Sequence, residues 1–346
     1  DRSETDEMGI KLTAQAMGID LEYLPFYKVA VGFGNSGFSY KSSGRDYTMA
    51  LKDVKVVLNR SQGKNRRIFA AAIIEALDKD VLNPLNIELS CQSKIRTLLM
   101  FYKEGVMIPK TVYVPCNAQE SKVGGGVLNN TDVISEMLVQ QLGNGKIVVK
   151  PDAGTHGSGV MLAEGKEALR GILKDVTPSV INPSGIVAQE FIPKWFYDLR
   201  ILVEKERGKP SFCQPIALVR AGFKEFRTNT FLGNMVFGVK LPAAVQREAL
   251  RCGECLTAGA EAWVLALDAM PYIGDERIVG DDEMRTYFRA LEDSFAEVKK
   301  VKQDPMKKVD FAKYSRNIEE AYTRYMSTEA YAKIQAVIQE SLEKKQ

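Results

Sequence analysis

Short apolar runs alternate along the first quarter of the chain with segments in which apolar residues recur at helical spacing. Asp6–Met17 and Ile68–Leu77 show the helical period, which predicts two helices. Leu21–Leu24 and Val54–Leu58 are short apolar runs, and we expect strands there. Because strands and helices alternate, the pattern favours a small α/β unit over residues 1–88.

The middle of the chain continues this alternation. Ser93–Val106 has helical spacing, with Ser93 as an N-cap and Gly105 as the residue that ends the helix. Ile108–Val114 and Lys146–Val149 are apolar runs that predict strands.

The second half adds apolar runs at Ile186–Pro193, Asp198–Val203 and Ala262–Asp268, each of which predicts a strand. From about Asp304 onward the pattern predicts two helices. Their apolar stripes are Phe311, Tyr314, Ile318, Tyr322 and Tyr325, and then Tyr331, Ile334, Ile338 and Leu342. Two interpretations of this tail stay open: a helical cap docked on the core, or a contact surface of a homo-oligomer.

These elements predict a mixed fold, α/β with α+β character. We expect an N-terminal α/β domain, a central domain, a C-terminal domain and a helical C-terminal extension. The expected boundaries are residues 1–88, 89–180, 181–300 and 301–346.

Composition is that of a soluble enzyme. The chain has 346 residues, of which 45% are hydrophobic and 26% charged, enough for two or three domains with sizeable cores. We expect no membrane span, because no apolar run approaches about 20 residues. The formal net charge of +3 does not indicate a nucleic-acid partner and is compatible with anionic substrates.

Cysteine usage indicates a reducing compartment, and we expect a cytoplasmic protein. An odd number of cysteines, five, argues against a disulfide framework. Cys252 and Cys255 form a CxxC, but they lie within Ala249–Ala262, which has helical spacing. A zinc site would need a second ligand pair, and His156 is the single histidine. We interpret the pair as two ordinary helix cysteines.

A glycine-rich loop follows the strand predicted at Lys146–Val149. Its sequence is Lys-Pro-Asp-Ala-Gly-Thr-His-Gly-Ser-Gly-Val, from Lys150 to Val160. Glycines let backbone N–H groups approach phosphate oxygens, and a lysine adds a point charge for the same anion. The segment therefore predicts a phosphate-binding loop. A second match, GxGxxG at Gly32–Gly37, lacks a following helical pattern, and we interpret it as a loop or hairpin.

The order of several motifs resembles the ATP-grasp superfamily, and within it the RimK-like carboxylate–amine ligases. The resemblance covers roughly residues 50–240. It rests on the Lys94 helix with the following Pro-x-Thr strand, the glycine loop, Gln-Glu-Phe-Ile at 189–192, Asp-Leu-Arg at 198–200 and Phe-Arg-Thr-Asn at 226–229. It implies an ATP-grasp fold with ATP and Mg²⁺ as cofactors.

The resemblance also assigns candidate nucleotide contacts. Lys94 and Lys150 would contact phosphates, and Asp198 would position the nucleotide or an arginine. Glu190 and the backbone near Phe191 and Ile192 would meet the adenine edge. The full set of predicted nucleotide-binding residues is Lys94, Lys150, Gly157, Ser158, Gly159, Gln189, Glu190, Phe191, Ile192 and Asp198.

Three arginines are the candidate catalytic cations. Arg200, Arg220 and Arg227 arrive on successive predicted strands or their connection. Arginine suits bidentate recognition of phosphate or carboxylate, and cations are needed along the charge that develops when a phosphoryl group transfers. Asn229 lies two residues from Arg227 and is predicted to share its strand face, in reach of phosphate or metal-bound water.

The predicted metal site departs from the family pattern. The family places an Asp on one strand and Glu-x-Asn on the next. Asp268 ends an apolar strand, but Glu-x-Asn is absent, and the nearest carboxylates on the expected next strand include Asp281 and Glu283. We therefore predict Asp268, Asp281 and Glu283 as ligands. A variant site, a divergent branch and a weakened enzyme remain open.

The resulting hypothesis is an ATP-dependent ligase. A small-molecule or peptide carboxylate would be phosphorylated, and an amine, for which an amino acid is a candidate, would attack the acylphosphate. Two alternatives stay open: a kinase that phosphorylates a small molecule, and a nucleotide-binding regulatory pseudoenzyme, which the absent Glu-x-Asn motivates.

Overall fold

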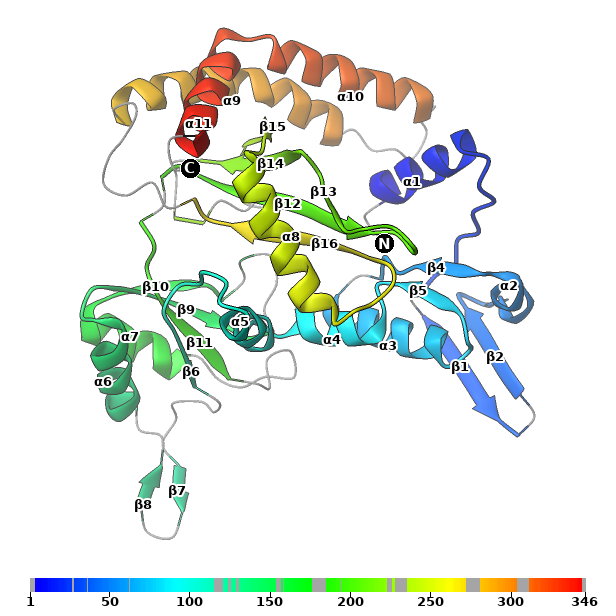
Figure 1. Ribbon diagram of the computed structural model, residues 1–346, viewed down its shortest axis with the longest axis horizontal. Helices are drawn as coiled ribbons and strands as arrows, with labels where there is room; N and C mark the ends of the chain where they lie inside the picture. The colour runs from blue at the N-terminus through cyan, green and yellow to red at the C-terminus, as the bar shows by residue number, and fades with distance from the viewer. Residues whose placement is uncertain are drawn as a thin grey trace. The chain divides into compact units, whose positions relative to one another are not determined.

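The computed structural model describes residues 4–26, 28–35, 37–61, 63–114, 121–123, 126–128, 131–153, 157, 159–175, 185–193, 195–222, 226–227, 235–271, 281–303 and 311–343. The chain divides between Leu89 and Ser90 into two units, which are treated separately below. Figure 1 labels their helices and strands.

The first unit combines a small antiparallel sheet with a pair of parallel strands. Its elements are α1 (Glu4–Ala16), β1 (Val29–Gly34), β2 (Gly37–Ser42), β3 (Arg45–Asp46), α2 (Thr48–Asp53), β4 (Val56–Leu58), α3 (Lys64–Glu75), β5 (Asp80–Leu82) and the start of α4 (Leu85–Gln92). The sheet order is β1-β2-β3, and β4 pairs with β5 in parallel across α3.

Two expectations for this unit have clear outcomes. The GxGxxG segment forms the β1–β2 hairpin, with Gly34 opposite Gly37, which confirms the hairpin interpretation. The strand predicted at Leu21–Leu24 is wrong, because that segment is irregular. Leu21 and Tyr23 are exposed, whereas Leu24 packs against the core of the unit without forming a strand.

The core of the first unit lies between the hairpin and α3. Its buried members are Tyr40, Leu51, Ala71, Ile74 and Val81. The buried Tyr40 hydroxyl donates to the Pro25 carbonyl at 2.8 Å, which satisfies its polar end inside the core.

The second unit begins with α5 and an antiparallel sheet in the order β10-β9-β11-β6. Its elements are α5 (Lys94–Lys103), β6 (Thr111–Val114), β7 (Ser121–Val123), β8 (Gly126–Leu128), α6 (Thr131–Leu142), β9 (Lys146–Pro151), β10 (Met161–Glu164), α7 (Gly165–Asp175) and β11 (Ile186–Glu190). The helix and strands predicted at Ser93–Val106, Ile108–Val114, Lys146–Val149 and Ile186–Pro193 are confirmed as α5, β6, β9 and β11.

We call the β10-β9-β11-β6 sheet the first sheet of the second unit. One of its faces packs on α6 and α7, which lie beside it in Figure 1. Alternate strand residues point into this core, including Val114, Ile147, Val149, Ile186 and Ala188. The intervening residues, among them Lys150, Gln189 and Thr111, point to the opposite face because side chains alternate along a strand.

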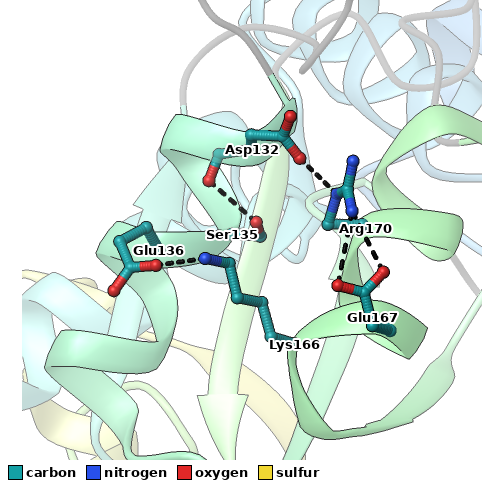
Figure 2. Close-up of polar contacts among 6 residues, drawn as sticks. All are labelled: Asp132, Ser135, Glu136, Lys166, Glu167 and Arg170. Atoms are coloured by element: carbon teal, nitrogen blue, oxygen red, sulfur yellow. Dashed lines mark hydrogen bonds and ion pairs between the residues drawn. The ribbon is translucent and has the colours of Figure 1, made fainter.

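Ion pairs join α6 to α7 on their outer surface (Figure 2). Lys166 pairs with Glu136, and Arg170 pairs with Asp132 across the two helices and with Glu167 one turn away. Exposed pairs of this kind contribute little each, about 0.2–1 kcal/mol. The buried apolar face therefore dominates the attachment of the helices to the sheet.

A second antiparallel sheet follows, and β12 lies at its centre. Its elements are β12 (Tyr197–Lys205), β13 (Phe212–Cys213), β14 (Ile216–Ala221), β15 (Met235–Lys240), α8 (Ala243–Thr257) and β16 (Trp263–Ala269). Leu199 of β12 pairs with Val219 of β14 and with Ala269 of β16, which places β12 between those strands. The strands predicted at Asp198–Val203 and Ala262–Asp268 are confirmed.

The two faces of the second sheet differ. The covered face holds Tyr197, Leu199, Ile201 and Val203, all of which are buried. Helix α8 crosses it closely, because a Cβ at Gly253 would lie 2.8 Å from the Trp263 ring. We call the opposite side the open face: it carries Asp198, Arg200, Arg220 and Asp268 together with the exposed Leu202, Ile216 and Leu218.

Three helices complete the second unit: α9 (Asp281–Gln303), α10 (Phe311–Met326) and α11 (Glu329–Glu343). The last two confirm the predicted tail helices. Helix α11 docks on the covered face, where the buried Tyr197 and Ser341 hydroxyls hydrogen-bond at 2.6 Å and Phe237 packs edge-on against Tyr331, and α10 packs on α9. Figure 1 shows α11 beside β15. Among the described residues, none of the helices has the length and apolar character needed to cross a membrane.

Candidate functional site

The N-terminus of α5 is fastened to the end of β9. Ser93 accepts a hydrogen bond from the Arg96 N–H at 3.2 Å, as predicted for an N-cap. The Asp152 carboxylate, buried with 1% exposure, accepts from the Ile95 N–H at 2.8 Å. The Lys94 ammonium donates to the carbonyls of Pro151 at 2.7 Å and Asp152 at 2.9 Å. These bonds bring Lys94 to the strand end that carries Lys150.

Lys150 is held from the neighbouring strand. Its Nζ donates to Oε1 of Gln189 at 2.6 Å, and the Gln189 Nε2 donates to the Thr111 hydroxyl at 2.9 Å. Gln189 was predicted as a nucleotide contact, but its side chain is 4% exposed and engaged on both ends. Its described contacts are therefore with Lys150 and Thr111.

The glycine loop is described at Gly157 and Gly159. Both have positive φ, +71° and +69°, a region that glycine adopts without strain. A Cβ at Gly159 would lie 3.0 Å from Cγ of Pro151. Ser158, another predicted loop contact, lies outside the described residues.

Arg227 connects the segment after β14 with this loop. Its guanidinium Nη1 donates to the Gly157 carbonyl at 3.2 Å. The neighbouring Phe226 ring lies edge-on to the Phe191 ring, with centroids 6.5 Å apart. The Lys146 ammonium lies over the Phe191 ring, 5.6 Å from its centroid. Asn229, predicted to act with Arg227, lies outside the described residues.

The residues predicted to face adenine follow β11. One Glu190 carboxylate oxygen accepts from the Lys110 N–H at 2.7 Å, and the Glu190 N–H donates to the Lys110 carbonyl at 3.1 Å. The Phe191 N–H donates to the Lys146 carbonyl at 3.1 Å. Ile192, which follows, is half-buried. These bonds anchor the segment beside the starts of β6 and β9, and the adenine contact remains a prediction.

The open face of the second sheet carries a linked set of two arginines and two aspartates, which we call the arginine–aspartate network: Asp198, Arg200, Arg220 and Asp268. Sheet register creates it, because Asp198 lies opposite Arg220 and Arg200 lies opposite Asp268. Arg220 Nε donates to Asp198 at 2.6 Å, and its Nη2 lies 3.1 Å from Asp268. Arg200 donates two hydrogen bonds to the Asp268 carboxylate, at 3.0 and 3.1 Å.

Burial divides this network into two halves. The side chains of Arg220 and Asp198 are 9% and 12% exposed, whereas those of Arg200 and Asp268 are 42% and 52% exposed. Burial favours the neutral form of Arg220, but the hydrogen bond to Asp198 and the charges of both aspartates outweigh it and raise the pKa of Arg220. Arg220 is therefore a fixed cation.

Among the predicted metal ligands, Asp268 pairs with Arg200 and Arg220, and the side chain of Asp281 lies outside the described residues. Asp281 is the first residue of α9, and Glu283 follows within that helix and pairs with Lys333 at 3.8 Å. The expectation that these acids follow on a strand is wrong. The missed signal is the helical spacing of the buried Met284, Phe288, Leu291, Phe295 and Val298. Within the described ranges there is no cluster of three potential metal-ligating side chains.

The CxxC pair lies in α8, as predicted, and both cysteines are free thiols. Burial, followed by the charge of Glu248, raises the pKa of Cys252 to about 11. Burial also raises the pKa of Cys255. A low thiol pKa is what redox and metal-binding cysteines need, so the environment opposes both functions.

Two residues at this site had no role in the sequence analysis. Thr111 belonged to the Pro-x-Thr motif and Asp152 to the glycine-loop motif, yet neither carried a predicted contact. Their motif positions were the available signal. Their partners lie 78 and 57 residues away along the chain, so spacing alone did not reveal them.

The site combines two antiparallel sheets, a strand-end lysine that leads into a glycine loop, and arginines on the second sheet. Residues 115–270 match the family model of the RimK-like ATP-grasp domain. Over these residues the chain is similar to RimK-like ATP-grasp domains.

Two relatives of known name are similar over most of the chain. The α-aminoadipate–LysW ligase LysX of Sulfurisphaera tokodaii is 24% identical over 216 residues, 61% of this chain and 67% of the relative. A probable α-L-glutamate ligase of Stenotrophomonas maltophilia is 26% identical over 246 residues, 70% of this chain and 75% of the relative. A solved RimK-domain ATP-grasp protein of Sphaerobacter thermophilus aligns with a TM-score of 0.46 and 15% identity, covering 73% of this chain and 77% of that one.

Proposed function

We propose that this protein is an ATP-dependent ligase that activates a carboxylate as an acylphosphate and joins it to an amine. The observation that carries the proposal is the Arg227–Gly157 bond of 3.2 Å. It brings a guanidinium of the segment after β14 to the glycine loop that begins at Lys150. A lysine of the first sheet and an arginine that follows β14 therefore both lie at a loop suited to phosphates.

The chemistry proceeds in two displacements. A carboxylate oxygen of the first substrate attacks the γ-phosphorus of ATP, and ADP leaves. The amine nitrogen of the second substrate then attacks the acyl carbon, phosphate leaves, and the nitrogen loses a proton. Lys94 and Lys150 bind the phosphates of ATP, and Arg227 and Arg200 face the transferring phosphoryl group. Arg220 holds Asp198, and no side chain acts as a covalent nucleophile.

Magnesium accompanies ATP in the family resemblance, but the described residues do not form a site for it. The Asp268 carboxylate is bound by Arg200 and Arg220, and Glu283 pairs with Lys333. Mg²⁺ prefers oxygen ligands that are free to coordinate it. We therefore assign no step to the metal, and Asp268 remains the proposed contributor of one carboxylate.

The names of the relatives suggest the first substrates to test. One name contains α-aminoadipate and the other α-L-glutamate, and both compounds are acidic α-amino acids. We propose an acidic α-amino acid as one of the two substrates. Arginine on the open face suits a substrate with an additional carboxylate, because its planar fork binds carboxylates with two parallel hydrogen bonds.

The test has two parts. ATP-dependent phosphate release is measured with pairs of carboxylates and amines that include glutamate and α-aminoadipate, and release that requires both partners supports the ligase. In parallel, Lys150→Ala should weaken ATP binding in calorimetry by tenfold or more, because a charged hydrogen bond is worth roughly 1.5–3 kcal/mol. Lys166→Ala, on the outer surface of α7 (Figure 2), is the matched control and should bind ATP normally. Unchanged affinity in Lys150→Ala would remove that residue from the site.

A second candidate is a nucleotide-binding regulatory protein without turnover. The specific observation in its favour is that Asp268 is neutralised by two arginines and that the described residues hold no cluster of three potential metal ligands. ATP binding without phosphate release in every substrate pair would favour it. Phosphate transfer to a hydroxyl without any amine would favour a kinase instead.

A further inference from the structure

Three side chains form a continuous hydrogen-bonded line across the first sheet, and we call it the Lys150 relay: Lys150 on β9, Gln189 on β11 and Thr111 on β6. Lys150 Nζ donates to Gln189 Oε1 at 2.6 Å, and Gln189 Nε2 donates to Thr111 Oγ1 at 2.9 Å. The Thr111 hydroxyl donates onward to the Pro109 carbonyl at 2.7 Å. The register sets this line, because Gln189 lies directly opposite Thr111.

The groups at the two ends of the relay fix which atom donates and which accepts in each of its hydrogen bonds. A lysine ammonium only donates, so the oxygen of the Gln189 amide must face Lys150. The amide nitrogen then faces Thr111, whose oxygen must accept. The Thr111 proton is left to donate to a carbonyl, which only accepts. The chemistry of the residues therefore dictates the amide orientation.

Burial makes this direction costly to change. The Gln189 side chain is 4% exposed, and a buried amide that loses a partner bears the desolvation penalty of that group. Rotating the amide by half a turn would set its N–H₂ group against the ammonium. The relay thus presents a fixed oxygen to Lys150.

We propose that Thr111 is a positioning residue for ATP binding, acting through Gln189 to hold the Lys150 ammonium at the start of the glycine loop. This inference rests on the proposed function. A lysine has a flexible stem, and holding its head group in advance reduces the rotamer freedom lost when phosphate binds. The relay also gives the Pro-x-Thr motif a physical reason, since Pro109 supplies the terminal carbonyl and Thr111 the hydroxyl.

The central experiment compares Thr111→Val, which keeps the shape and removes the hydroxyl, with Thr111→Ser, which restores it. Thr111→Val should weaken ATP binding about 3- to 10-fold in calorimetry, the effect of losing one neutral hydrogen bond. Thr111→Ser should bind like the wild type. Thr257→Val is the matched control, because Thr257 is buried and donates to a backbone carbonyl at the end of α8. It should leave the affinity for ATP unchanged.

A double-mutant cycle separates positioning from a general structural role. In the Lys150→Ala background, Thr111→Val should have no further effect on the affinity for ATP, because the group it positions is gone. A loss of equal size in both backgrounds would overturn the proposal. So would wild-type affinity in Thr111→Val while Lys150→Ala binds weakly.

A readout without nucleotide distinguishes failure of the relay from failure of the proposed function. The acylation rate of the Lys150 amine, followed by mass spectrometry in the absence of ATP, should rise in Thr111→Val and return in Thr111→Ser. An unchanged rate would overturn the relay. A raised rate in a protein that binds no ATP would support the relay and refute the proposed function instead.

Discussion

The two arginines of the arginine–aspartate network should respond in opposite ways to removal. We consider Arg200→Met and Arg220→Met, which keep the aliphatic stem and remove the charge. Arg220 and Asp198 are 9% and 12% exposed and joined by a bond of 2.6 Å. Arg200 and Asp268 are 42% and 52% exposed. The difference in solvent contact determines what each deletion costs.

Removing Arg220 leaves the Asp198 charge in a largely dry position. Breaking a buried ion pair in this way costs about 3–5 kcal/mol, a large share of the 5–15 kcal/mol that stabilises a typical domain. Removing Arg200 breaks an exposed pair worth about 0.2–1 kcal/mol. If Arg200 faces the transferring phosphoryl group, its loss should lower kcat by about 100-fold or more. Arg220→Met should therefore mainly destabilise, and Arg200→Met should mainly inactivate.

Urea unfolding and ATP turnover measure the two effects separately. Adding Asp198→Asn to Arg220→Met should recover much of the lost stability, because the uncompensated charge is then gone. This rescue also keeps the test informative if Arg220→Met does not fold. The reasoning is refuted if Arg200→Met loses as much stability as Arg220→Met, or if Asp198→Asn makes Arg220→Met less stable.

Three further predictions concern other parts of the chain. With the pKa of Cys252 raised to about 11, roughly one thiol in several thousand is ionised at pH 7.5, so alkylation should be far slower than for free cysteine; rapid alkylation would contradict the assignment as a structural thiol. Burial raises the pKa of Glu88 and outweighs the lowering by Arg67, so its stabilising contribution is full below the unfolded pKa and is lost as pH rises through the folded one. Glu88→Gln should accordingly raise the melting temperature of the first unit at pH 7 and lose that advantage in acid, which thermal scans across pH will check. Gly159→Ala should weaken ATP binding, because its φ of +69° strains an L-residue by about 1–2 kcal/mol, whereas Gly145→Ala, with open space around it, should not.

The sequence pattern predicted correctly those elements that depend on residues close together in the chain. The strand at β9, the N-cap of α5 by Ser93 and the β1–β2 hairpin all follow from residues within a few positions of one another. The placement of Arg200 and Arg220 on neighbouring strands was also predictable, since both lie in apolar runs. What failed at Asp281 was the expectation of a strand by analogy, against a helical stripe that the chain itself displays from Met284 onward.

Cross-strand contacts could not be predicted from the sequence, because they depend on the register between strands that lie far apart in the chain. Asp198 was predicted to position a nucleotide or an arginine, but nothing local pairs it with Arg220, which lies opposite only through the β12–β14 alignment. The contact of Gln189 with Thr111 likewise depends on the β6–β11 alignment, and its nucleotide contact stays a prediction. A one-residue slip in either alignment would send these side chains to opposite faces.

The charge balance of the open face leads to a last prediction, for Asp268→Asn. The network holds two arginines and two aspartates, so its formal charges cancel, and an ATP phosphate that approaches Arg200 must compete with Asp268. That carboxylate already occupies Nε and Nη2 of Arg200. Asparagine keeps the shape and removes the competing charge.

We therefore expect Asp268→Asn to bind ATP about two- to fivefold more tightly in the presence of EDTA, the effect of releasing an exposed ion pair. Turnover should fall, because the carboxylate proposed to contribute to a metal site is gone. Calorimetry in EDTA and phosphate release in Mg²⁺ measure the two quantities on the same preparation. If Asp268→Asn binds metal-free ATP more weakly than the wild type, Asp268 aligns the arginines for phosphate rather than competing with it. If its turnover is unchanged, Asp268 does not contribute to the metal site.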